Sequence, residues 1–143
     1  MAYGFVRMAG ALLLSLGVST PALAESEVIW AQLGAELYER RCSVCHGTEA
    51  IGDGMVGTLF RIKPPNLTTL TRDNGGVFPF LEVFQAVDGH RKIAAHGESE
   101  MPIWGDLLMD EAFLREDFNA DDARYATLGR LLSLVYFLQS IQQ

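Results

Sequence analysis

The residues of this chain that could do chemistry are gathered in one short stretch, Cys42-Ser43-Val44-Cys45-His46. The sequence contains 2 cysteines, both in this stretch, and the histidine follows the second one directly. Two thiols beside an imidazole could form a redox-active disulfide or hold part of a zinc site. They could also attach a haem through thioether bonds, with the histidine on its iron.

The first two chemistries fit the remaining sequence less well. A redox dithiol of this spacing is expected beside a βαβ pattern, and no segment shows convincing strand alternation. A closed zinc site usually uses more than two cysteines, although His46, His90 or His96 could contribute. Because C-x-x-C-H is the attachment signature of c-type haem, we predict one haem c bound covalently by Cys42 and Cys45, with His46 on the iron. A zinc site and a plain disulfide are the alternatives.

The segments that must position this motif have the patterns of helices joined by long loops. The predicted helices cover residues 27–41, 67–72, 78–87, 106–118 and 123–141. Asp88-Gly89 is expected to end the third of them, and Asn119 or Asp121 to cap the last. The loops over 47–76 and 90–105 are longer than a compact domain normally has, unless they surround a site. The sequence therefore predicts an all-α domain in which a buried cofactor supplies part of the core.

The first 24 residues have the features of a secretory signal peptide. Arg7 precedes an apolar run over residues 8–18, and Ala22-Leu23-Ala24 is a small-residue cleavage site. A retained membrane anchor is the alternative, but the run is shorter than the roughly 20 residues that a spanning helix needs. We therefore divide the chain into a signal peptide, 1–24, and one domain, 25–143, exported to the periplasm.

Charge narrows the range of partners. The chain has 18 acidic against 11 basic side chains, a formal net charge of −7. Such a balance does not favour binding to nucleic acid or to an anionic membrane surface. We expect protein partners with basic or apolar docking faces.

Taken in order, the motifs resemble those of the class I cytochrome c family over most of residues 25–143. The matching features are Gly34 and Tyr38 before the cysteines, Pro65-Asn66-Leu67 as a proline loop, Met101-Pro102 as a methionine-ligand loop, and Leu134 with Phe137 in the last helix. The resemblance implies a cytochrome c-like fold, with N- and C-terminal helices packed around a covalently bound haem and long ordered loops. It also implies a single-electron carrier rather than an enzyme.

The resemblance assigns roles to residues outside the C-x-x-C-H motif. His46 is expected to donate its second ring N–H to a backbone carbonyl, that of Pro65, which would fix the tautomer of the ring. Leu67 is expected to pack on the haem.

Gly34 is expected to let the first and last helices approach closely, with Tyr38 and Phe137 around the crossing. The alternative is a glycine that merely weakens its helix, by up to about 1 kcal/mol.

Met101 is the predicted second iron ligand. It stands between Glu100 and Pro102, outside any apolar stripe, whereas a methionine that fills a core lies on one. A thioether ligand favours ferrous iron and raises the reduction potential, as suits an electron carrier. The alternatives are His96, His90, Met55 and Met109.

The predicted function is to carry electrons between a dehydrogenase or respiratory complex and an acceptor. A haem enzyme or gas sensor is the alternative, and it would need a labile sixth iron position.

The acidic stretch 106–122 departs from the family and is either an added helix that covers the haem or docks a partner, or a solvated face. Trp104, Arg91 and Lys92 could lie near the haem propionates or be ordinary packing and surface residues.

Overall fold

The computed structural model describes residues 22–89, 104–115 and 117–143. In these ranges the chain forms α-helices and short 3-10 helices, without a strand. The α-helices are α1 (Ala22–Arg41), α2 (Ser43–His46), α3 (Leu70–Asp73), α4 (Phe80–Asp88), α5 (Trp104–Phe113) and α6 (Ala120–Ser140), and the 3-10 helices are η1 (Gly57–Leu59) and η2 (Leu67–Thr69). The predicted all-α class is confirmed.

Some predictions concern residues outside the described ranges. These residues are Met101, His90, His96, Arg91, Lys92 and most of the predicted signal peptide. The division of the chain at residue 24 falls within α1 and stays a prediction. No helix in the described ranges has both the length and the apolar character needed to cross a membrane.

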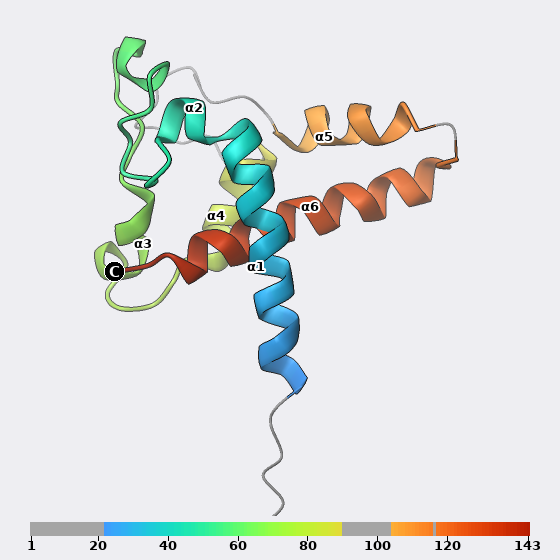
Figure 1. Cartoon of the computed structure of the whole chain (residues 1–143), viewed down its shortest axis with the longest axis horizontal. Helices are drawn as coiled ribbons and strands as arrows, with labels where there is room; N and C mark the ends of the chain where they lie inside the picture. The colour runs from blue at the N-terminus through green and yellow to red at the C-terminus, as the bar shows by residue number, and fades with distance from the viewer. Residues whose placement is uncertain (1–21, 90–103, 116) are drawn as a thin grey trace, which may run out of the picture.

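The fold is organised around the crossing of α1 and α6 at a steep angle (Figure 1). Gly34 lies at this crossing, where a Cβ atom would be 1.9 Å from the carbonyl oxygen of Ser133 and 2.8 Å from Cβ of Phe137. The rings of Tyr38 and Phe137 pack beside it, with centroids 5.1 Å apart. The close approach predicted for Gly34 is confirmed.

α6 supplies the largest share of the core, because α1, α4 and α5 all pack against it. α5 runs along its N-terminal half (Figure 1). The buried apolar residues include Leu37 and Tyr38 of α1, Val83 and Val87 of α4, Leu108 and Ala112 of α5, and Leu131, Leu134, Val135 and Leu138 of α6. Leu128 of α6 is 43% exposed, although it lies at helical spacing from the buried Leu131 and Val135.

The apolar side of α1 is only half buried. Leu37 and Tyr38 lie in the core, but Ile29 and Leu33 are 58% and 49% exposed. The reason is visible in Figure 1, where the N-terminal half of α1 extends beyond its crossing with α6. Helical periodicity alone does not reveal how far along a helix its partner reaches.

The predicted helix ends are confirmed where capping residues mark them. Gly89 ends α4 with a left-handed φ of 92°, which glycine adopts without strain. Asn119 caps α6 by accepting from the N–H groups of Asp121 and Asp122, and the Asp122 carboxylate accepts from Asn119 N–H in return. α5 ends at Phe113, earlier than predicted, and the turn after it is held by the guanidinium of Arg115 over the Phe118 ring.

We predict that Gly34→Ala lowers the free energy of unfolding by about 1–3 kcal/mol, because the new methyl group forces α1 away from Ser133. Gly129→Ala is the matched control, since its Cβ would meet only Trp30, at 3.9 Å. That control should stabilise α6 by up to about 1 kcal/mol through helix propensity. Chemical denaturation of the purified protein measures both. Equal stability of the two variants would contradict the tight crossing.

Candidate cofactor site

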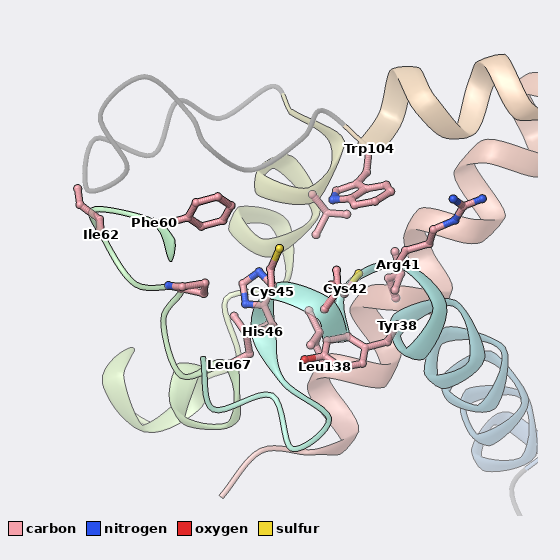
Figure 2. A pocket seen from close by; sticks show the side chains of 14 residues that line it. Tyr38, Arg41, Cys42, Cys45, His46, Phe60, Ile62, Leu67, Trp104 and Leu138 are labelled. Atoms are coloured by element: carbon pink, nitrogen blue, oxygen red, sulfur yellow. The ribbon is translucent and has the colours of Figure 1, made fainter. Parts of the chain in front are cut away.

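Cys42, Cys45 and His46 direct their side chains into a cavity of about 200 Å³ (Figure 2). The other walls come from the loop after α2, from α4, from α5 and from α6. Those walls consist mainly of apolar residues, namely Phe60, Ile62, Pro64, Leu67, Val87, Trp104, Leu134 and Leu138. The cavity thus has its reactive groups on one side and a water-excluding lining on the others.

A single helical turn, residues 42–46, brings the three reactive side chains together. Cys42 N–H donates to the Tyr38 carbonyl at 2.7 Å, and His46 N–H donates to the Cys42 carbonyl at 2.9 Å. Residues at positions i, i+3 and i+4 of a helix share one face. Both thiols and the imidazole therefore point to the same side of the 42–46 turn.

The next loop packs directly on the back of this turn. A Cβ on Gly54 would lie 2.5 Å from the Cys45 carbonyl carbon, and one on Gly57 would lie 2.2 Å from its oxygen. Val56 N–H donates to the Val44 carbonyl at 3.0 Å, which fastens the loop in place. The absence of side chains on these two glycines allows the backbones to touch.

Burial raises the pKa values of the two thiols. Both cysteines are free. Burial, with a smaller effect of Cys45, raises the pKa of Cys42 to about 12, and burial also raises the pKa of Cys45. In the described part of the chain no group of three or more His, Cys, Asp or Glu side chains is arranged to hold a metal ion.

The residues present fit a flat apolar macrocycle attached through two thioethers. The 42–46 turn presents both sulfurs and the imidazole toward one apolar space (Figure 2). The His46 Nδ1 atom is buried, and the His46 side chain lines the cavity. Imidazole is a suitable ligand for iron.

The structure places the residues predicted around the haem as follows. Leu67 and Trp104 line the cavity. Pro65 is exposed, and its neighbour Pro64 lines the wall instead. The bond from His46 to the Pro65 carbonyl stays a prediction, as does the proximity of Trp104 to a propionate.

Two of the alternative iron ligands can be located. Met55 is 78% exposed and does not line the cavity. Met109 lies between α5 and α6, where its sulfur is 3.8 Å from the Thr127 hydroxyl. Met109 therefore serves in packing between α5 and α6.

Sequence reasoning missed Arg41 as a cavity residue. Its guanidinium pairs with Glu111 of α5, whose second oxygen lies 3.7 Å from Arg130 of α6. This carboxylate thus joins α1, α5 and α6 at the edge of the cavity. The available signal was the position of Arg41 directly before Cys42, which requires it to share the surroundings of the motif.

Residues 31–115 match a family model described as cytochrome c oxidase, cbb3-type, subunit III. The matched range contains the 42–46 turn, the glycine loop behind it and all of α5. No curated protein and no solved structure matches the chain.

Tyr38 connects the helix crossing to the 42–46 turn. Its hydroxyl donates to the Gly47 carbonyl at 2.7 Å from a buried position. Burial is the main reason that the pKa of Tyr38 lies well above its usual value, with Cys42, Glu39 and Asp53 adding to the effect. The folded protein therefore keeps this phenol protonated at a pH where the unfolded chain ionises it.

We predict that Tyr38→Phe lowers the free energy of unfolding by about 0.5–1.5 kcal/mol at neutral pH through loss of this hydrogen bond. Above pH 10, the unfolded chain loses the Tyr38 proton while the folded protein retains it. The protein with tyrosine at position 38 then loses up to about 1.4 kcal/mol per pH unit relative to Tyr38→Phe. Denaturation at several pH values measures the difference. Tyr125→Phe, at an exposed position, is the control and should show neither effect.

Proposed function

Because this chain belongs to the cytochrome c oxidase, cbb3-type, subunit III family, we propose that it is a periplasmic single-electron carrier whose haem is bound by the 42–46 turn. The matched domain is a class I c-type cytochrome domain, which confirms the family resemblance. Such a domain carries covalently bound haem c, and it makes the chain a haem-based electron-transfer protein.

The observation that carries the proposed site is that Cys42, Cys45 and His46 face one apolar cavity from a single helical turn. Cys42 and Cys45 would hold the haem through two thioether bonds. His46 would bind the iron. The bound haem supplies a one-electron iron couple.

The remaining walls exclude water from this couple. Leu67, Leu134 and Leu138 reach the cavity from η2 and α6. An apolar, poorly hydrated surrounding disfavours the more highly charged ferric state and so raises the reduction potential. These walls suit an electron carrier.

We propose Met101 as the second iron ligand. Val87 and Trp104 line the cavity, and they lie close to the two ends of the segment that contains Met101. The described residues that flank this segment therefore lie on the cavity wall. His90 and His96 belong to the same segment and are the alternatives that the experiment below must exclude.

The exposed side chains of α5 favour docking of a partner protein whose surface is basic and partly apolar. Asp106 and Asp110 are exposed on it, beside Leu107 and Phe113, which are 43% and 53% exposed. This helix starts at Trp104 on the cavity wall, so a protein docked there would lie near the cofactor. A respiratory donor or acceptor with a basic and apolar face fits this surface.

A periplasmic location is supported by the sequence of the first 24 residues, which has the charged start, apolar run and small-residue site of an export signal. Haem attachment and electron carriage would then take place after export.

We predict that the matured protein exceeds its polypeptide mass by one haem, and that Cys42→Ala/Cys45→Ala carries none, because only these two thiols can form the thioethers. Co-expression with a haem-attachment system, followed by mass spectrometry, tests this. Ser43→Ala, which leaves both thiols in place, is the control and should retain the haem. A wild-type chain at its bare mass would refute the proposed function.

We predict that Met101→Ala abolishes the charge-transfer band between methionine sulfur and ferric iron, lowers the potential, and lets the reduced protein bind carbon monoxide rapidly. Visible spectra in both redox states measure these changes. Met55→Ala removes an exposed methionine and should leave the spectra unchanged. Rapid carbon monoxide binding by the unaltered protein would favour a haem enzyme or gas sensor instead.

A further inference from the structure

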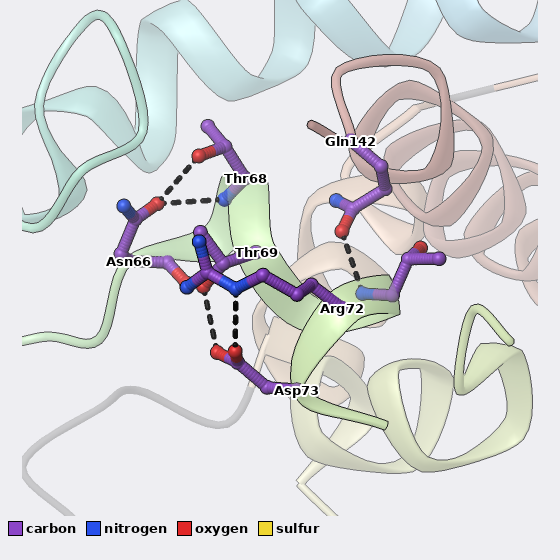
Figure 3. Close-up of polar contacts among 7 residues, drawn as sticks. Asn66, Thr68, Thr69, Arg72, Asp73 and Gln142 are labelled. Carbon is purple, nitrogen blue, oxygen red and sulfur yellow. Dashed lines mark hydrogen bonds and ion pairs between the residues drawn. The ribbon is translucent and has the colours of Figure 1, made fainter. Parts of the chain in front are cut away.

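One side chain, the amide of Gln142, is hydrogen-bonded to the backbone of two residues on different walls of the cavity. Its Nε2 donates to the Leu67 carbonyl at 2.8 Å and to the Leu138 carbonyl at 2.6 Å. The side chains of both leucines line the cavity. Its Oε1 accepts from Thr71 N–H at 2.9 Å (Figure 3).

The turn that carries Leu67 has its own internal bonds, which hold its shape. The Asn66 side chain accepts from the N–H and hydroxyl of Thr68, and the Thr69 hydroxyl donates to Asp73 at 2.7 Å (Figure 3). These bonds lie within residues 66–73. They do not determine where the turn sits relative to the rest of the cavity.

Longer-range bonds place the turn. Leu67 N–H donates to the Ala50 carbonyl at 2.8 Å, which ties it to the loop that follows His46. Leu67 C=O accepts from Gln142, which ties it to the end of α6, and Gln143 N–H adds a bond of 2.9 Å to the Thr68 carbonyl. Leu67 is thus held from both sides, and Gln142 makes the bond that reaches Leu67 itself from the α6 side.

We propose that Gln142 is a positioning residue that fixes the place of Leu67 relative to Leu138 and thereby sets the reduction potential of the cofactor. The inference rests on the proposed haem site. A primary amide suits this task because it has two N–H donors and an acceptor oxygen, and the three partners use all of these functions. A side chain without donors cannot bridge the two carbonyls.

The expected consequence follows from the lining of the cavity. Loss of the bridge removes the bond between Leu67 and the α6 end, although the Gln143 N–H bond to Thr68 remains. Leu67 is then held less firmly against Leu138, and water enters between the two side chains. Water stabilises the more highly charged oxidised iron, so the reduction potential falls. The axial ligands and the haem attachment stay the same.

The experiment compares haem-loaded Gln142→Leu and Gln142→Glu with the wild-type protein. Both remove the donors, while Gln142→Glu keeps the size of the side chain and the acceptor for Thr71. Potentiometric titration should give a lower potential for both variants, and the hyperfine-shifted haem methyl signals of the ferric protein should move. Gln139→Leu, at an exposed position of α6, is the matched control and should change neither.

A double-mutant cycle with Leu67→Ala tests the route of the effect. If Gln142 acts through Leu67, Gln142→Leu shifts the potential less in the Leu67→Ala background than in the wild type. Wild-type potentials in the haem-loaded Gln142 variants, or fully additive shifts in the cycle, would overturn the inference. Gln142→Glu carries the test if Gln142→Leu gives no folded protein. Failure of the proposed function is distinct, because the wild-type chain would then contain no haem.

Discussion

The close crossing of α1 and α6 at Gly34 is the contact on which the rest of the structure depends. One helix turn beyond it, α1 places Tyr38 against the 42–46 turn, while α6 continues past Ser133 to Leu134 and Leu138 on the opposite wall. The distance between the helices therefore fixes the distance between the reactive groups and the apolar surface that faces them. The two backbones can approach this closely because Gly34 has no side chain to stand between them.

The helices were predictable from sequence because their signals are local. Asn119, with Asp121 as the alternative, was predicted as the cap of the last helix, and Asp88-Gly89 as the end of the helix over 78–87. The exposure of Ile29, Leu33 and Leu128 was not predictable, since periodicity identifies an apolar face but not the length of it that a partner covers. That length depends on where helices distant in sequence cross.

Some residues of the candidate site were predictable from the sequence, and others were not. The two thiols and His46 were found from their spacing, and Leu67 from the resemblance. The loop residues Phe60 and Ile62 were missed, because their position on the cavity arises from the path of a loop without regular periodicity. Arg41 was missed although it ends α1 directly before Cys42. The wall formed by Pro64 rather than Pro65 is likewise a matter of backbone direction at two adjacent prolines.

The helical geometry of the 42–46 turn limits which lengths of the motif can work. One extra residue between the cysteines would rotate the second sulfur by about 100° around the helix axis, away from the space that the first one faces. The loop from Phe60 to Lys63 is under no comparable angular restriction, because only its ends are tied by the bonds of η1 and Leu67. Insertions and deletions among related chains should therefore be tolerated in that loop and absent between the thiols.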